Sequence, residues 1–322
     1  MVYRSPIAGE AMTKASAYVE RFYYPGVLAG SLGLALGLVE AGFSAGFVLG
    51  VTSVGLGVFS FWMERRFTET SLWKIDPTEV RTDILHALIS NTIPTALFRA
   101  LFLWLIVAAS AWIESRIGAG LWPVHWPLPG QFLLALFVAE FVSYATHRGL
   151  HRSRLWPLHA VHHCSPRMYF LLSVRKHPLQ AFLTYGGRLS VLWLLGVPEQ
   201  TLTVLLAFTA ANSYLQHSNV RMRTGVLGWI FATPELHRIH HSRRTSDLDS
   251  NFGDVLIIWD VLFGTRRAPD ARAGATDVVG LPDIEVPQTW RSHLRLPFVW
   301  HRLRADADAA QAAPAGGSGS PN

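Results

Sequence analysis

Long apolar stretches separated by short polar segments dominate the first half of the chain. Between Gly26 and Met63 the only formal charge is Glu40. A single helix of that length would overshoot a bilayer core of about 30 Å. The pattern therefore predicts two membrane-spanning helices, at 26–43 and 46–63.

Two further apolar stretches predict a third span at 92–113 and a fourth at 130–147, which ends at the first of several histidine motifs. A last apolar stretch, 181–216, is divided by the turn signal Gly-Val-Pro-Glu at 196–199. Its halves of about 15 residues are short for full crossings. We expect a short re-entrant helical hairpin whose two ends return to the same side.

The charges of the connecting segments predict the orientation of these helices. The connection after the third span carries only Arg116 as a basic residue, whereas the segment after the fourth span is rich in arginine. The connection between the second and third spans is also basic, with Arg65, Arg66, Lys74 and Arg81. The positive-inside rule then gives a cytoplasmic N-terminus and a cytoplasmic histidine region. A multi-pass protein of a bacterial inner membrane is expected.

Composition agrees with a membrane protein. Of the 322 residues, 50% are hydrophobic and only 16% are charged, against about 25% charged in soluble domains. A single cysteine excludes a disulfide scaffold and a cysteine-rich zinc or iron–sulfur site. The net charge of +6 comes from arginines that follow the positive-inside pattern, so it gives no reason to expect nucleic acid as a partner.

Histidine is the second unusual feature of the composition, because ten of the 14 histidines fall between positions 147 and 241. The motif HRGLH covers 147–151, and the motif HxxHH occurs twice, at 159–163 and at 237–241. The ten histidines are His147, His151, His159, His162, His163, His177, His217, His237, His240 and His241. The remaining four, His86, His125, His293 and His301, are assigned no function.

The spacing of the motifs predicts metal binding. Residues i, i+3 and i+4 share a helix face, whereas adjacent residues diverge by about 100°. The two last histidines of each HxxHH are therefore placed to bind different metal ions. Zinc takes four ligands, so ten histidines exceed two zinc shells. Two six-coordinate ions with five imidazoles each would keep an open position, which suits redox iron and dioxygen.

In this order after hydrophobic spans, HRGLH, HAVHH and HRIHH resemble the fatty acid hydroxylase/sterol desaturase superfamily of integral-membrane di-iron oxygenases. The resemblance covers about residues 130–266. Glu140, seven residues before His147, and the pieces DSNFG and WDVLFGT add to it and are similar to the sterol-desaturase branch. That branch often reads HPxE after the second motif, where this chain has Gln180, so a role for position 180 in orienting a ligand is in doubt.

The resemblance implies an all-α membrane fold of about four spans, with a cytoplasmic helical cap in which the ten histidines hold two iron ions. It also implies hydroxylation or desaturation of a lipid, such as a sterol or hopanoid, a fatty acyl chain or an ether lipid, with O2. No dinucleotide fingerprint or P-loop is present in the sequence, so electrons are expected from a separate protein or a diffusible reductant.

Three residues are candidates to orient metal-bound histidines: Glu140, for His147 or a nearby ligand, and Asp249 and Asn251, for His240 or His241. Glu140 could instead make a buried hydrogen bond to a neighbouring helix, and the other two could be ordinary turn residues. Cys164, next to His163, could be a thiolate ligand or a small buried residue.

The sequence divides into a membrane region at 1–129, a catalytic domain at 130–266, a cytoplasmic C-terminal segment at 267–304 and a low-complexity tail at 305–322, expected to be disordered. Other functions stay open: a metal transporter, a metal-dependent hydrolase or a b-type cytochrome. The absence of an HExxH motif and the position of the histidines after the spans, rather than within them, disfavour these alternatives.

Overall fold

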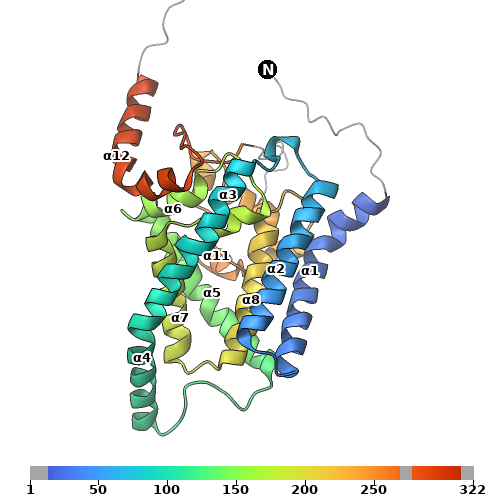
Figure 1. Cartoon of the computed structure of the whole chain (residues 1–322), viewed down its shortest axis with the longest axis vertical. Helices are drawn as coiled ribbons and strands as arrows, with labels where there is room; N and C mark the ends of the chain where they lie inside the picture. The colour runs from blue at the N-terminus through green and yellow to red at the C-terminus, as the bar shows by residue number, and fades with distance from the viewer. Residues whose placement is uncertain (1–13, 269–277, 313–322) are drawn as a thin grey trace, which may run out of the picture.

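The computed structural model describes residues 14–268 and 278–312, and these are helical apart from turns, connections and three isolated β-bridges (Figure 1). A short π-helical segment, His86–Asn91, joins α3 to α4. The helices are α1 (Lys14–Glu40), α2 (Ala45–Arg66), α3 (Pro77–Leu85), α4 (Thr92–Ile117), α5 (Leu128–Arg152), α6 (Trp156–His163), α7 (Pro178–Leu194), α8 (Glu199–His217), α9 (Pro234–His240), α10 (Thr245–Leu248), α11 (Ile258–Leu262) and α12 (Trp290–Ala312).

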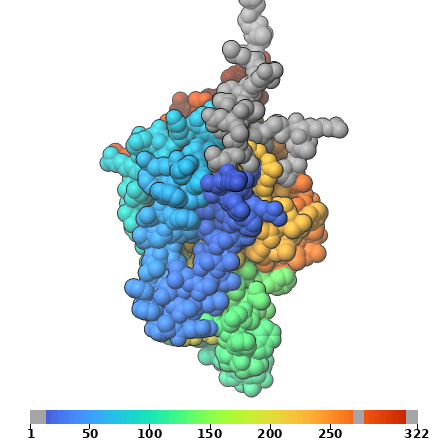
Figure 2. Space-filling model, turned by 90° about the vertical axis from the view of Figure 1, so that its right-hand side faces the viewer, coloured from blue at the N-terminus to red at the C-terminus, as the bar shows by residue number. Residues whose placement is uncertain are grey.

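Four helical stretches are long and apolar enough to cross a membrane: Lys14–Glu40, Ala45–Arg66, Pro77–Ile117 and Leu128–Arg152. The predicted all-α membrane fold with four spans is therefore confirmed. The helices extend beyond the predicted bounds, because the apolar pattern detects only the part that would lie in hydrocarbon. Figure 2 shows the side of the molecule covered by α1 and α2. Large apolar side chains such as Val54 and Val58 are exposed on α2, as expected for a surface that faces lipid.

The apolar stretch 181–216 folds as two antiparallel helices, α7 and α8, that turn at Gly196. This glycine has a φ of 77°, in the left-handed region that glycine adopts without strain. The turn lies at the same end of the molecule as the α1–α2 turn, and both outer ends of the hairpin lie at the opposite end (Figure 1). The depth of this hairpin in a bilayer stays a prediction.

The hairpin forms the centre of the molecule. Helix α8 packs against α1, α2 and α5, and α7 packs against α4 and α5. At Gly186 a Cβ atom would lie 2.5 Å from the ring of Phe98, so any other residue there would require this ring of α4 to move. This packing fixes the end of α8, which carries His217.

A helical cap covers the end of the bundle where α5 and α8 finish. Helix α12 packs across α6, and the buried side chains of Leu281 and Ile284 join the same apolar cluster. Helix α12 continues to Ala312, eight residues past the point where the sequence suggested that a disordered tail begins. Alanine-rich sequence and the i,i+4 ion pairs Arg302–Asp306 and Arg304–Asp308 favour helix there. The rest of the predicted tail lies outside the described residues.

Candidate metal centre

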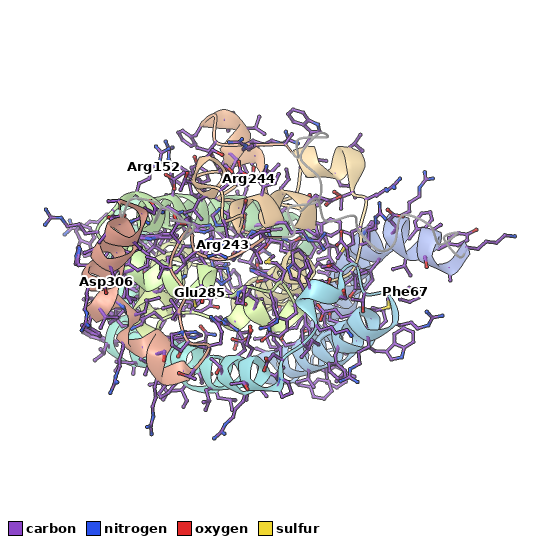
Figure 3. The ribbon with its side chains drawn as sticks, turned by 90° about the horizontal axis from the view of Figure 1, so that it is seen from above. Phe67, Arg152, Arg243, Arg244, Glu285 and Asp306 are labelled. Carbon is purple, nitrogen blue, oxygen red and sulfur yellow. The ribbon has the colours of Figure 1, made fainter. Side chains whose placement is uncertain are left out.

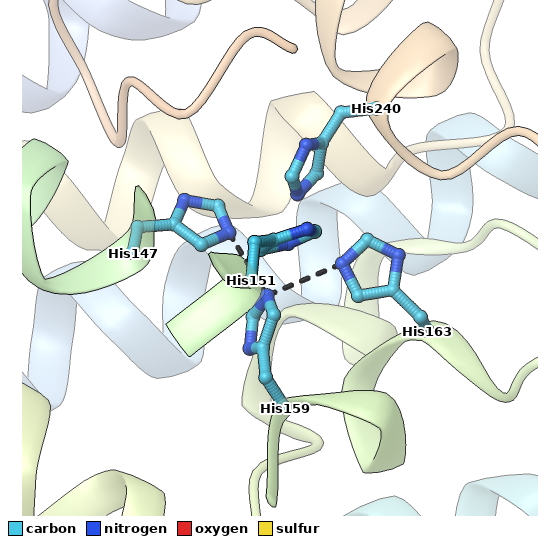
Figure 4. Close-up of side chains that lie close together, drawn as sticks. All are labelled: His147, His151, His159, His163 and His240. Carbon is cyan, nitrogen blue, oxygen red and sulfur yellow. Dashed lines mark hydrogen bonds between the residues drawn. The ribbon is translucent and has the colours of Figure 1, made fainter. Parts of the chain in front are cut away.

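Nine of the ten candidate histidines converge in two groups, within each of which the ligand atoms lie within 4.8 Å of one another. The five-histidine group contains His147, His151, His159, His163 and His240 (Figure 4). The four-histidine group contains His162, His217, His237 and His241.

Each HxxHH motif contributes to both groups. In α6, His159 and His163 join the five-histidine group, while His162 turns to the other. In the second motif the assignment is reversed, because His237 and His241 join the four-histidine group and His240 the five-histidine group. The two adjacent histidines of each motif diverge, as the spacing predicted. The spacing left open which of them joins the first histidine, and the structure pairs the first with the histidine at i+4.

His177 lies in neither group. It is the N-cap of α7, where its Nδ1 accepts a hydrogen bond from the backbone N–H of Leu179 at 3.2 Å. A histidine before a proline at the first helical position is well placed to cap the helix, since the ring can reach an N–H that has no partner within the helix. The geometry gives no support to its predicted role as a ligand.

Backbone carbonyls determine which ring nitrogen faces the centre of each group. A carbonyl oxygen only accepts, so a ring Nδ1 beside it carries the proton and leaves a lone pair on Nε2. Four histidines have such a partner: His147 with Phe252 at 2.8 Å, His240 with Ser250 at 2.7 Å, His217 with Ser213 at 2.7 Å and His162 with Arg175 at 3.2 Å.

The bare Nε2 atoms crowd together. Nε2 of His217 lies 3.2 Å from Nε2 of His162, although both rings carry their proton on Nδ1. Two lone pairs at that distance repel unless a cation lies between them. Two imidazole nitrogens bound at right angles to one ion, each at about 2.1 Å, would lie about 3 Å apart. The donor set of this structure therefore fits a metal.

Burial keeps the imidazoles neutral. His159, His162 and His241 are at most 5% exposed. Burial, reinforced by the charges of neighbouring imidazoles, holds the pKa of each of these three side chains well below the ordinary value of 6.5. Neutral rings at pH 7 are what metal binding requires.

The segment 249–252 orients the five-histidine group. Besides the carbonyls of Ser250 and Phe252, it provides Asp249, whose Oδ1 lies 3.3 Å from Nδ1 of His151. Asp249 was expected to orient a histidine, although His240 or His241 was the expected partner. The accepting carbonyls of Ser250 and Phe252 carry no signature in the sequence.

Asn251 holds this segment rather than a histidine. It adopts a left-handed backbone, with φ of 54°, and its side-chain amide donates to the carbonyls of Leu236 and Arg267, each at 2.9 Å. An asparagine tolerates that conformation better than most residues do, which explains its position in the loop.

Glu140 also acts on this loop. Its Oε2 accepts hydrogen bonds from the backbone N–H groups of Val255 at 2.6 Å and Leu256 at 2.9 Å, instead of contacting His147. Asp260 accepts from the N–H groups of Phe252 and Gly253, each at 2.8 Å. Asp260 therefore holds the residue whose carbonyl orients His147, and Glu140 holds the backbone three and four residues further along the chain.

Gln180 contacts a histidine of the site, contrary to the doubt that the missing acid raised. Nε2 of its side-chain amide lies 2.8 Å from Nδ1 of His159, and this NH2 group can only donate to the ring, whereas a carboxylate at the same position would accept from it. Cys164 belongs to neither group. Burial raises the pKa of its thiol to about 11, so it is a small buried residue and not a thiolate.

A cavity of about 350 Å³ reaches both groups. His147 and His159 of the five-histidine group line it, as do His162, His217 and His237 of the four-histidine group. A substrate in this cavity would contact both candidate metal positions.

Comparison with known proteins identifies the same region. Residues 132–265 match the fatty acid hydroxylase family. The chain is 35% identical over 217 residues to an ornithine lipid hydroxylase of Rhizobium tropici, an alignment that covers 67% of this chain and 65% of that protein. It is 32% identical over 171 residues to an alkylglycerol monooxygenase of Caenorhabditis elegans, covering 52% of this chain and 32% of that protein.

The human alkylglycerol monooxygenase is 28% identical over 189 residues, which is 58% of this chain and 41% of that protein. The chain thus aligns with less than two thirds of each of these relatives. No solved structure matches the chain significantly. The order and geometry of its histidine motifs and the match over residues 132–265 agree: the chain belongs to the fatty acid hydroxylase superfamily.

Proposed function

We propose that this protein is a membrane-bound oxygenase that uses two iron ions, O2 and external electrons to hydroxylate or desaturate a C–H position of a lipid. One observation carries the proposal: two groups of imidazoles lie beside one cavity that reaches both, and two rings in each group have their Nδ1 against a backbone carbonyl, which leaves Nε2 bare. Of the two reactions, hydroxylation is favoured by the names of the relatives above, which are hydroxylases and monooxygenases.

The donor set favours a redox metal. Imidazole suits zinc, copper, iron and nickel, but a five-histidine group exceeds the four ligands of a structural zinc site. An iron pair in these groups would supply the redox chemistry with O2 that an unactivated C–H bond requires. His177 is proposed as a tenth ligand only if its ring leaves the N-terminus of α7.

The chain itself would hold, orient and shield the site. The carbonyls of Phe252, Ser250, Ser213 and Arg175 keep the Nδ1 proton of four rings in place, so that Nε2 stays available. The burial of the rings excludes water, and the cavity places a substrate C–H against both groups.

The substrate is proposed to be a lipid with a polar headgroup. The relatives are named for an ornithine lipid and for alkylglycerols, which favours this class over a sterol or hopanoid. Access from the membrane would bring such a lipid to the cavity without its acyl chains crossing water.

The cap is proposed to face the cytoplasm of a bacterial cell, where a separate protein or a diffusible reductant would supply electrons. Figure 3 looks down on this face, where Arg152 and Arg244 are exposed. The single native cysteine is buried, so a membrane-impermeant maleimide should react only with an introduced, exposed cysteine. Its labelling in intact cells then shows on which side of the membrane that position lies. Asp306→Cys should be protected from an impermeant maleimide in intact cells and Val124→Cys labelled; the reverse would contradict this orientation.

Lipid turnover tests the function directly. Purified protein loaded with iron and supplied with a reductant should add one oxygen atom to a membrane lipid, and 18O2 should label the product. Lipidomes of cells with and without the gene would identify the lipid by a mass gain of one oxygen or a loss of two hydrogens. Full activity with zinc alone and without O2 would contradict the proposal.

A further inference from the structure

The wall of the cavity carries charged residues as well as histidines. Lys176, Arg188 and Asp254 all line it. Arg188 lies in the middle of the apolar helix α7 and is only 4% exposed. A buried cation in an apolar helix is costly, and such residues often mark a binding site.

The two cations flank one aromatic ring. Nζ of Lys176 lies 5.5 Å from the ring centre of Tyr185, and the guanidinium carbon of Arg188 lies 5.6 Å from it. The acid beside them is Asp254, whose Oδ2 accepts from Nη1 of Arg188 at 3.1 Å. Of these charged residues that line the cavity, two are cations and one is a carboxylate. Glu140 does not line the cavity, but it lies behind this wall within electrostatic reach of Asp254 and Arg188.

Hydrogen-bonding capacity on this wall is left unused. Nε of Arg188 is buried and has no hydrogen-bond partner among the described residues. The same holds, within the described part of the chain, for Oδ1 of Asn91, Oγ of Ser173 and Oε1 of Gln180, and all three residues line the cavity. A buried polar atom without a partner is destabilising. An alkyl chain in this cavity would leave these atoms unpaired. An anionic group could accept from Nε of Arg188 and from the hydroxyl of Ser173, whereas the amide oxygens of Asn91 and Gln180 would need a donor, such as a hydroxyl or N–H of a headgroup.

We propose that Arg188 and Lys176 bind an anionic group of the substrate, a carboxylate or a phosphate, so that the headgroup and not the end of an acyl chain enters the cavity. This inference rests on the proposed lipid oxygenase. Arginine suits such groups, because its planar fork of N–H donors matches the oxygens of carboxylate and phosphate. The oxidised carbon then lies close to the headgroup, because the same cavity is lined by histidines of both groups.

Binding without turnover tests the proposal. The probes are two matched pairs: N-lauroylglycine with its methyl ester, for a carboxylate, and lysophosphatidic acid with monoacylglycerol, for a phosphate. Dissociation constants are measured on purified, detergent-solubilised protein below the critical micelle concentration of each probe. Wild-type protein should bind the anionic member of at least one pair about tenfold or more tightly than the neutral one. The pair that shows this preference identifies the anion.

Variants locate the preference. Arg188→Gln should abolish it, and Lys176→Gln should reduce it, whereas the exposed Arg295→Gln serves as the matched control and should keep it. Arg188→Lys retains a charge and should keep part of the preference, which separates a binding role from a packing role. Metal content and melting temperature of each variant check the fold. Equal affinity for charged and neutral probes in the wild type, or an undiminished preference in both Arg188→Gln and Lys176→Gln, would overturn the proposal.

The outcomes separate this proposal from the proposed function. A preference for anionic probes without any O2-dependent lipid oxidation would overturn the oxygenase and keep the binding site. Oxidation of lipids by a protein that binds neutral and anionic probes equally would keep the oxygenase and overturn the binding site.

Discussion

The five-histidine and four-histidine groups are built from the same two HxxHH motifs but are held in place by different parts of the molecule. The five-histidine group depends on one loop, since segment 249–252 contacts the rings of His147, His151 and His240. The four-histidine group depends on helix ends and on a buried ion network. His217 bonds to the carbonyl of Ser213 in its own helix, and His162 bonds to the carbonyl of Arg175.

Arg175 connects the four-histidine group to the bundle. Its side chain is fully buried, with Nε 2.6 Å from Oδ1 of Asp83 and Nη2 3.2 Å from Oε2 of Glu79, both on α3. Metal binding by the five-histidine group should therefore be sensitive to changes in segment 249–252. Metal binding by the four-histidine group should be sensitive to changes that destabilise the whole fold.

The largest effect is expected from removing a ligand. His237→Ala leaves three imidazoles in the four-histidine group, so the protein should lose about one ion per chain and its activity. His163→Ala leaves four in the five-histidine group, so the metal should largely stay although activity falls. Metal analysis by mass spectrometry measures both, with His125→Ala as the control. Equal metal loss in both variants would contradict the expectation that the group with more ligands keeps its metal when one histidine is removed.

The next effect concerns the ion network. Arg175→Leu leaves the buried carboxylates of Asp83 and Glu79 without their shared partner, which should destabilise the fold by about 3–5 kcal/mol. Thermal unfolding in detergent measures this, with the exposed Arg295→Leu as the control. If Arg175→Leu melts at the wild-type temperature but loses metal, the network acts on the metal site alone. That result would contradict the claim that it supports the four-histidine group through the stability of the fold.

The pH dependence should be shared by the two groups. Burial lowers the pKa of His163 in one group and of His162 and His241 in the other, so the unfolded chain takes up protons that the folded chain excludes. Stability is then complete above the ordinary histidine pKa and falls as the pH drops below about 6.5, by up to about 1.4 kcal/mol per pH unit for each such histidine. Melting temperatures of metal-free protein between pH 8 and pH 5 check this. A flat profile would contradict it.

A smaller effect is expected for the loop. Asp249→Asn removes the carboxylate 3.3 Å from His151, and the loss of such a partner commonly costs about tenfold to a hundredfold in metal affinity or activity. The exposed Asp306→Asn is the matched control. Metal titration should show a weaker five-histidine group and an unchanged four-histidine group. Weakening of both groups to the same extent would argue that the loop supports the whole centre.

Helix periodicity predicted that the last two histidines of each HxxHH motif face different centres, because side-chain direction on a helix follows from spacing. It could not predict which of the two joins the first histidine, since both i+3 and i+4 lie near the face of residue i. The four spans followed from hydropathy in the same way. The sequence could also suggest Glu140, Asp249 and Asn251 as important, since polar residues near a metal motif are conspicuous.

Their partners could not be predicted. The carbonyls of Ser250 and Phe252 orient two rings, but every residue has a carbonyl, so no side chain marks them. Glu140 was expected near His147, yet its position relative to the loop depends on tertiary packing between residues more than a hundred positions apart. His177 was grouped with the ligands because the resemblance implied it, and in the structure it caps the N-terminus of α7 before Pro178.

The most direct test of the two-group centre is a structure of the iron-loaded protein with an anomalous difference map calculated at the iron edge. The account predicts two iron peaks, one enclosed by His147, His151, His159, His163 and His240, the other by His162, His217, His237 and His241. A single iron shared by both groups, or iron bound elsewhere with these rings bonded only to one another, would contradict it.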